Sequence, residues 1–148
     1  MEHPLKKTIA LALLALIAAT PAVARNNAVT VSLQSVLDMP EAKDKLGGMR
    51  FYLAGGKAPK VVKKFGGDTS NASTNAFNKT PEQACRWNAL SALIKLREKA
   101  LRYEANAVVD IVSVRDHVEF KSPTDIECSD GALRGAITLR GTYAKVGK

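Results

Sequence analysis

Aromatic residues, histidine and cysteine are scarce in this chain of 148 residues, and each scarcity excludes a kind of chemistry. Aromatic residues make up 5% of the chain, and there are two histidines and two cysteines. Structural zinc sites are built from several His and Cys ligands, so we expect no metal site. Cys85 and Cys128 do not form the C-x-x-C motif of a redox pair. We expect no cofactor.

Long hydrophobic runs are also lacking. The one long apolar run, residues 9–19, is well short of the ~20 residues that a transmembrane helix needs. It follows Lys6 and Lys7 and precedes the small residues Ala22 and Ala24, which is the arrangement of a secretory signal peptide. We therefore expect cleavage after about Ala24.

Cleavage at this point divides the chain into a signal peptide, residues 1–24, and a single domain, residues 25–148. The second part is long enough to bury a core of its own. We expect this domain to be periplasmic or secreted, and not to span the membrane after cleavage.

Basic residues outnumber acidic ones. The chain has 22 Lys and Arg against 14 Asp and Glu, which is a net charge of +8, and loss of Glu2, Lys6 and Lys7 leaves +7. In an exported protein this charge favours an anionic envelope component, such as lipid head groups, lipopolysaccharide or cell-wall polymers, or an acidic protein face. Nucleic acid is not expected as a partner. The alternative is that the charge serves solubility alone.

Cys85 and Cys128 are predicted to form a disulfide. Two cysteines in a small exported domain usually pair, because the compartment is oxidising. Closing a loop of 43 residues stabilises a fold by about 4 kcal/mol in the chain-entropy model.

One long helix is predicted from Thr80 to about Tyr103. Thr80 suits the N-cap, Pro81 suits the first helical position, and Gln83 completes a capping box. Apolar residues cover a wide arc of this helix, so it is expected to be mostly covered by the rest of the domain.

Strands are predicted on both sides of this helix. The alternation of apolar and polar residues, or a run of β-branched residues, predicts strands at 28–33, 49–54, 107–114, 117–120 and 133–146, with a short helical turn between 39 and 47. The fold class is therefore α+β: one antiparallel-rich β-sheet packed by one long α-helix, as a two-layer sandwich.

Residues 55–80 are predicted to form a long basic and polar loop. Glycine pairs and a run of Asp, Thr, Ser and Asn cannot build a core. The candidate anion-binding residues are four lysines in this loop and two arginines that fall within the apolar arc of the helix: Lys57, Lys60, Lys63, Lys64, Arg86 and Arg97. For the two arginines, snorkelling or pairing with acids is the alternative.

We expect no catalytic residues. His117 is the only histidine after residue 24, and no nucleophile motif lies beside it. Asp110 interrupts an apolar run, where it is expected to pair with Arg134 or Arg140. Trp87 is expected in the core or beside the disulfide. The lysine loop has no interleaved aromatic residues of the kind that bind single-stranded nucleic acid.

Three motifs between residues 84 and 146 carry a resemblance to a known family. They are Asn88-Ala89-Leu90, Asn106-Ala107-Val108-Val109-Asp110-Ile111 and Gly141-Thr142-Tyr143-Ala144-Lys145-Val146. This segment resembles the YbjQ-like superfamily, which also includes the envelope-stress sensor RcsF. That resemblance implies metal or small-ligand binding and homo-oligomers, for which a strand edge such as 117–120 could pair.

A closer likeness covers nearly all of residues 25–148. It is carried by Phe51-Tyr52, by Thr69-Ser70-Asn71, by the segment 74–79 and by Cys85-Arg86-Trp87. It is to small exported bacterial proteins of unknown function, often labelled "excinuclease ATPase subunit". An ATPase of that kind needs the loop G-x-x-x-x-G-K-[ST], which this sequence lacks. No ATPase activity is expected.

Two departures from the YbjQ-like pattern have consequences. The family usually has glycine where Glu104 stands, at a left-handed turn that ends the helix, so Glu104 costs about 1 kcal/mol there or shifts the helix end. RcsF-like sensors also carry a lipid-anchored cysteine and a second disulfide, which are absent here, so sensing of that type is not expected. The leading hypothesis is a non-enzymatic binding module for an anionic envelope partner. The alternative is a metal or small-ligand binding domain.

Overall fold

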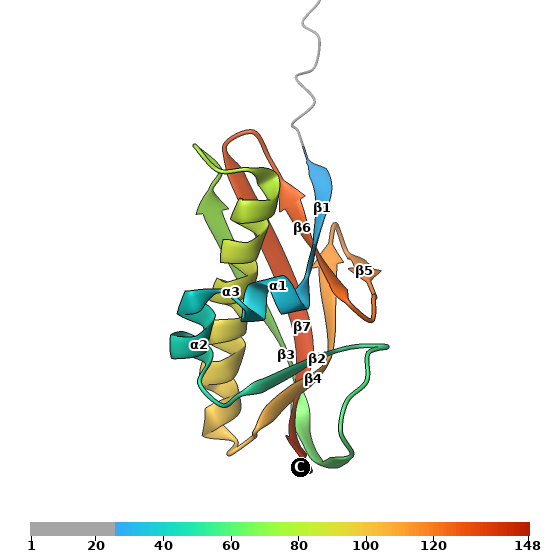
Figure 1. The fold of residues 1–148 in the computed structure, drawn as a ribbon. Helices are drawn as coiled ribbons and strands as arrows, with labels where there is room; N and C mark the ends of the chain where they lie inside the picture. Colours follow the sequence, from blue (N-terminus) through green and yellow to red (C-terminus); the bar gives the residue numbers. More distant parts are fainter. Residues whose placement is uncertain (1–25) are drawn as a thin grey trace, which may run out of the picture.

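The computed structural model describes residues 26–148, so the predicted signal peptide lies outside the described residues. Seven strands and three helices follow one another along the chain (Figure 1). In chain order they are β1 (Asn27–Ser32), α1 (Leu33–Leu37), α2 (Pro40–Leu46), β2 (Arg50–Leu53), β3 (Val61–Asn75), α3 (Pro81–Arg102), β4 (Ala107–Arg115), β5 (Val118–Phe120), β6 (Asp125–Asp130) and β7 (Arg134–Val146).

All seven strands belong to one curled sheet. Its order is β1-β6-β7-β4-β2, with β3 paired to β7 and β5 paired to β4 (Figure 1). Every pair is antiparallel except β2 with β4. The mixed, antiparallel-rich character predicted from the sequence is therefore confirmed. The helical turn predicted between residues 39 and 47 is α2, whereas α1 was not predicted.

The long helix begins as predicted. The Thr80 side chain accepts a hydrogen bond from the Gln83 N–H, and the Gln83 side chain accepts one from the Thr80 N–H, which forms the capping box. The buried side of α3 includes Leu90, Leu93 and Leu96. Ser32 caps α1 in the same manner, through the N–H of Ser35, so the chain turns into a helix where the first strand was expected to continue to Leu33.

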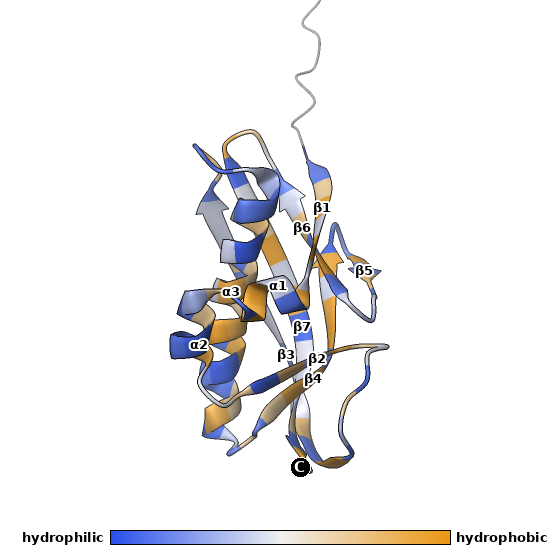
Figure 2. Cartoon of the chain, viewed as in Figure 1, coloured by the Kyte–Doolittle hydropathy of each residue, from blue (hydrophilic) through white to orange (hydrophobic). Residues whose placement is uncertain are grey.

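The predicted loop at residues 55–80 is wrong for most of its length, because it contains β3, the longest strand. β3 pairs with β7 from Val61 to Asn75. Its inward positions are occupied by small residues, Ser70 and Ala72, and Ser70 donates a hydrogen bond to the carbonyl of Ala92 on α3. Figure 2 shows little apolar colour on β3 where it passes beside α3. Close approach to the helix, and not large apolar side chains, fixes this strand.

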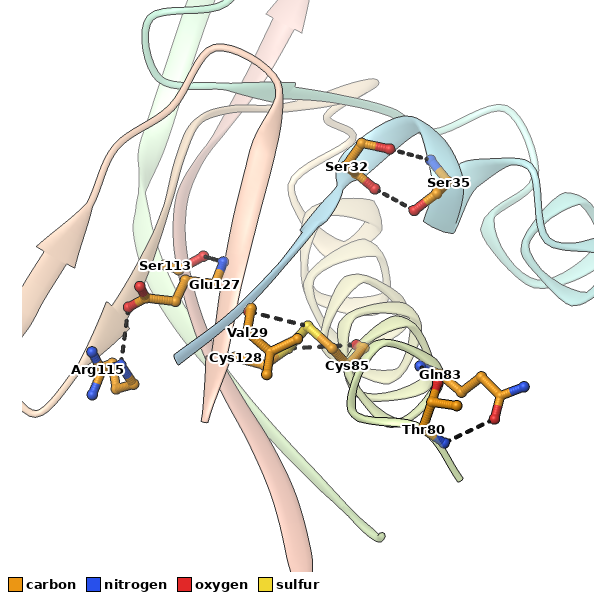
Figure 3. The surroundings of a disulfide bond; sticks show 10 residues. All are labelled: Val29, Ser32, Ser35, Thr80, Gln83, Cys85, Ser113, Arg115, Glu127 and Cys128. Atoms are coloured by element: carbon orange, nitrogen blue, oxygen red, sulfur yellow. Dashed lines mark hydrogen bonds and ion pairs between the residues drawn. A yellow bond between two sulfur atoms is a disulfide. The ribbon is translucent and has the colours of Figure 1, made fainter. Parts of the chain in front are cut away.

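The predicted disulfide is present. Cys85 at the start of α3 is bonded to Cys128 on β6, and both residues are buried (Figure 3). Around it, the main core joins α1, α2 and α3 to one face of the sheet. The disulfide therefore fastens the helix to the strand that also pairs with β1.

A bulge in β4 sets the register of the centre of the sheet. The pairing with β7 shifts between Val109 and Val112, and Asp110 has a φ of 54°. Gly141 lies across from this bulge, and a Cβ there would be 2.7 Å from Val108 Cγ1 and 3.1 Å from Ile111 Cγ1. Only glycine fits where the two strands approach so closely.

None of the helices in residues 26–148 is both long and apolar enough to cross a membrane.

Candidate functional site

The paired ends of β3 and β7 bring basic residues together. Lys63 lies opposite Lys145 in the register, and Gly147 donates its N–H to the carbonyl of Lys60. Arg50 of β2 reaches the same end and donates hydrogen bonds to the carbonyls of Gly147 and Val146, at 3.1 and 3.4 Å. Like charges that lie opposite one another destabilise a sheet. The register therefore places two cations on adjacent strands at this end of the sheet.

The last turn of α3 adds further cations. Lys99 and Arg102 lie in this turn, and Lys145 Nζ donates to the carbonyl of Glu104 at 3.1 Å, beside the negative end of the helix dipole. We name this surface the basic end; it lies at the end of the sheet where the chain terminus is marked in Figure 1. Its seven basic and three acidic residues are Arg50, Lys60, Lys63, Lys64, Lys99, Arg102 and Lys145, with Asp68, Glu104 and Asp110.

Three aromatic rings stack within the basic end. Lys63 Nζ lies 5.0 Å from the centroid of the Phe65 ring, Phe65 stacks on Tyr103 at 6.2 Å, and Tyr103 stacks on Tyr143 at 5.5 Å. This cluster is not evident from the sequence, because Tyr103 caps the end of α3 and Tyr143 lies in β7, far from Phe65 along the chain. The signal that was available was Phe65, directly after the lysine run. The two tyrosines hold the Phe65 ring in place, and Lys63 contacts that ring. The stack therefore positions Lys63.

Asp68 connects the stack to α3. Its carboxylate pairs with Lys99 at 2.9 Å and accepts hydrogen bonds from the Tyr143 hydroxyl at 3.0 Å and from the Thr69 N–H at 2.7 Å. The hydrogen bond from Lys99 is the main cause that lowers the pKa of Asp68. Burial, followed by the bond to Asp68, raises the pKa of Tyr143. A hollow of about 210 Å³ lies between Asp68, Lys99, Arg102 and Tyr103.

The predicted lysine cluster is partly assembled and partly dispersed. Lys60, Lys63 and Lys64 lie in the basic end, where Lys64 pairs with Asp110 at 3.0 Å. The expected partner of Asp110, Arg134 or Arg140, was wrong; Arg140 pairs with Glu119 instead. The φ of Asp110 turns it out of the strand, so it is exposed towards β3 and not buried in the apolar run.

Lys57 lies apart from Lys60, Lys63 and Lys64, beside a second hollow. This hollow has a volume of about 410 Å³ and lies between α1, β2 and the segments around Lys57 and Pro123. Its lining is mainly apolar, with Leu33, Leu37 and Tyr52 among the residues, and Lys57 is exposed at its rim.

The two arginines that the sequence offered as anion-binding candidates, Arg86 and Arg97, do not join Arg102 in the basic end. Arg97 Nε donates to the carbonyl of Leu46 at 3.0 Å, so Arg97 closes the end of α2. Arg86 is half-buried one residue after Cys85. Trp87 was expected in the core or beside the disulfide; 40% of its surface is exposed, so it is not a core residue, and it follows the disulfide-bonded Cys85 by two residues.

Within residues 26–148, no three His, Cys, Asp or Glu side chains lie close enough to hold a metal ion. His117 is exposed on the turn between β4 and β5, with a φ of 65°. The basic end, by contrast, offers exposed ammonium and guanidinium groups on fixed strands, which is the chemistry of anion binding.

No family model, no curated protein sequence and no solved structure matches the chain. Its function is therefore inferred from the residues described above.

Proposed function

We propose that this protein is a non-enzymatic binding module that contacts an anionic partner of the cell envelope through its basic end. The observation that carries the proposal is the placement of Lys63 opposite Lys145 at an end where seven basic residues meet three acidic ones. An anion held between the two ammonium groups would offset their repulsion. The aromatic stack keeps Lys63 in place for that contact.

The partner best suited to this surface is a multivalent anion. Lys64 is 56% exposed and Lys99 is 42% exposed, so each single contact is weak and screened by salt. Several weak contacts add up on a membrane or polymer that carries many phosphate or carboxylate groups. A small monovalent anion would gain little here.

Location outside the cytoplasm is part of the proposal. The buried Cys85–Cys128 disulfide fits an oxidising compartment, and the sequence of residues 1–24 has the pattern of a secretory signal. We place the protein in the periplasm or the secreted fraction, as a two-layer α+β domain in which α3 covers one face of the sheet.

The YbjQ-like and RcsF-like relationship also remains a proposal. It is supported by Glu104, which has a φ of 55° directly after α3, at the position where the family resemblance implies a left-handed turn. Ala105, which follows, donates its N–H to the carbonyl of Ala100 and so closes the helix end.

A second candidate function is binding of a small ligand in the hollow beside Lys57. Its volume of about 410 Å³ falls within the range of natural ligand sites. Its apolar lining and the cation at its rim suit a small molecule with an apolar body and an acidic group. This function would not involve Lys63 or Lys145.

The test is sedimentation of the purified, oxidised protein with vesicles of phosphatidylglycerol and phosphatidylcholine, against vesicles of phosphatidylcholine alone. Salt is varied between about 20 mM and 500 mM, which shortens the Debye length several-fold. The variant Lys60→Ala/Lys63→Ala/Lys145→Ala removes three charges from the basic end. The control Lys43→Ala/Lys45→Ala/Lys121→Ala removes three exposed charges elsewhere.

We expect the wild type and the control to bind anionic vesicles at low salt, and the basic-end variant to lose most of this binding. Equal losses in the two variants would show that only net charge matters and would contradict the proposal. Binding that survives high salt unchanged would also contradict it.

A further inference from the structure

The strand β3 leaves one of its two edges unpaired over its whole length. Among the described residues β3 pairs only with β7, from Val61 to Asn75. An unpaired edge presents free backbone N–H and C=O groups, to which another strand can pair. Proteins usually protect such edges with charges, bulges or covering elements.

The two halves of β3 differ in this protection. The half at 61–67 carries Lys63 and Lys64 and two bulges, at Val62 and Phe65, where the register shifts. The half at 69–75, which we name the neutral half, has the sequence Thr-Ser-Asn-Ala-Ser-Thr-Asn, without charge, proline or bulge. Regular pairing with another strand is therefore open only to the neutral half.

Two lysines show which backbone groups face the free edge. Lys95 Nζ donates to the carbonyl of Asn71 at 2.6 Å, and Lys79 Nζ donates to the carbonyl of Asn75 at 3.0 Å. In an antiparallel strand the N–H and C=O of one residue point to the same side, and this side alternates from each residue to the next. The carbonyls of Asn71 and Asn75 are four residues apart, so both point to the same edge. Thr69 and Ser73 therefore also direct their backbone groups to the free edge.

We propose that the neutral half pairs with the neutral half of a second copy of this chain, antiparallel about Ala72. This register places Asn71 opposite Ser73 of the second copy and Thr69 opposite its Asn75. All four of these residues direct backbone groups to the edge, so the main-chain hydrogen bonds match once the Thr69 N–H is released from the Asp68 carboxylate, to which it donates at 2.7 Å. The strand ends at Asn75, so Lys63 and Lys64 lie beyond the end of the second strand.

Charge complementarity on α3 favours a second copy as the occupant. α3 runs antiparallel to β3, since Ser70 contacts Ala92 and Asp68 contacts Lys99. Pairing about Ala72 then brings the two α3 helices antiparallel on one face of the joined sheet. In this arrangement the positive N-terminal end of each α3 lies beside the negative C-terminal end of the other, so the two helix dipoles attract each other.

An exposed tryptophan lies on the same side of α3. Trp87 is eight residues before Lys95, which places the two side chains about 80° apart around the helix, and Lys95 reaches the edge of β3. Trp87 is 40% exposed. The second copy would cover this ring, and tryptophan is among the residues that contribute most at interfaces.

Lys79 and Lys95 limit the strength of this association. They hold two of the carbonyls that the second strand needs, and they add positive charge at the pairing edge. Removal of both ammonium groups frees the acceptors. We therefore expect Lys79→Ala/Lys95→Ala to tighten self-association by roughly tenfold or more.

The experiment is sedimentation-velocity centrifugation of the oxidised protein up to about 500 µM, a concentration at which micromolar dimers form. Asn71→Lys/Ser73→Lys places lysine opposite lysine across the interface and is expected to give a monomer. Asn71→Asp/Ser73→Lys changes the same exposed positions but places aspartate opposite lysine, and is expected to keep or tighten the dimer. Circular dichroism checks that each variant is folded.

Dimers of the wild type that are lost in the lysine pair and kept in the charge-matched variant support the proposal. It is overturned if the wild type and Lys79→Ala/Lys95→Ala both stay monomeric at the highest concentration. It is also overturned if the lysine pair dimerises as well as the wild type, because the interface would then lie elsewhere.

Discussion

The two halves of β3 pair with the same strand, β7, but they present opposite surfaces. Residues 61–67 are bulged twice and lie in the basic end, where Lys63 meets Lys145. Residues 69–75 are regular and uncharged, and their exposed side chains are Thr, Asn and Ser. One half is suited to anions, and the other to a strand. The difference shows that a single long strand can carry two kinds of contact when bulges and charges are confined to one part of it.

Asp68 and Gly141 form the junction between the two halves. They lie opposite one another in the β3–β7 register. Asp68 holds Lys99 and Tyr143 at the basic end, while Gly141 allows β7 to approach the bulge of β4. Changes at this junction affect both halves, and changes on either side of it should affect one.

The largest effect is expected from removal of the disulfide, which joins α3 to β6. Cys85→Ala/Cys128→Ala should lower the free energy of unfolding by about 4 kcal/mol, because the 43-residue loop is then free in the unfolded chain. Urea unfolding measures the loss, and the reduced wild type should show a similar loss. A change below about 1 kcal/mol would contradict the loop-entropy account.

A smaller loss is expected at the junction. Gly141→Ala places a methyl group 2.7 Å from Val108 Cγ1, and such overpacking should cost about 2 kcal/mol. Gly48→Ala is the matched control, because nothing lies within 4 Å of its added Cβ and its φ is not positive. Thermal unfolding of both variants makes the comparison. Equal melting temperatures would show that β4 and β7 can separate without cost.

Ionisation of Asp68, the carboxylate at the junction, should make the free energy of unfolding depend on pH. Because Lys99 lowers the pKa of Asp68 in the folded state, its contribution is complete above the ordinary value of about 3.9 and is lost as pH falls through the folded pKa. Asp68→Asn should remove this part of the acid slope and cost less than about 1 kcal/mol at pH 7, since the ion pair is partly exposed and screened. Urea unfolding at several pH values below 5 measures it. An unchanged slope would assign the acid sensitivity to other carboxylates.

The smallest effect is a gain at the end of α3. Glu104→Gly should stabilise the protein by about 0.5 kcal/mol, because glycine adopts the φ of 55° without the steric cost of a side chain, although it leaves the unfolded chain more freedom. Glu98→Gly, at an exposed position inside the helix, should instead destabilise by about 1 kcal/mol. Loss of an acid from the basic end should also strengthen vesicle binding, and a loss of binding would contradict the proposed site.

The sequence was most informative where local chemistry decides the structure. Thr80, Pro81 and Gln83 predicted the start of α3, because an N-cap, a first-turn proline and a capping box act within one turn. The disulfide between Cys85 and Cys128 followed from the number of cysteines and the expected compartment.

The sequence was least informative where distant segments decide the structure. β3 was missed because its inward residues, Ser70 and Ala72, are small, and their burial depends on the closeness of α3. The aromatic stack was missed because Tyr103 and Tyr143 meet Phe65 only after folding. Lys57 was grouped with the other lysines by sequence, but the chain carries it to a separate hollow.

The most direct test of a strand with two separate roles is vesicle binding measured at low salt for one variant from each half. We predict that Lys60→Ala/Lys63→Ala/Lys145→Ala loses binding to phosphatidylglycerol vesicles, while Asn71→Asp/Ser73→Lys, which leaves the net charge unchanged, binds like the wild type. If the neutral-half variant lost as much binding as the basic-end variant, or if neither lost any, the assignment of anion binding to the basic end would be contradicted.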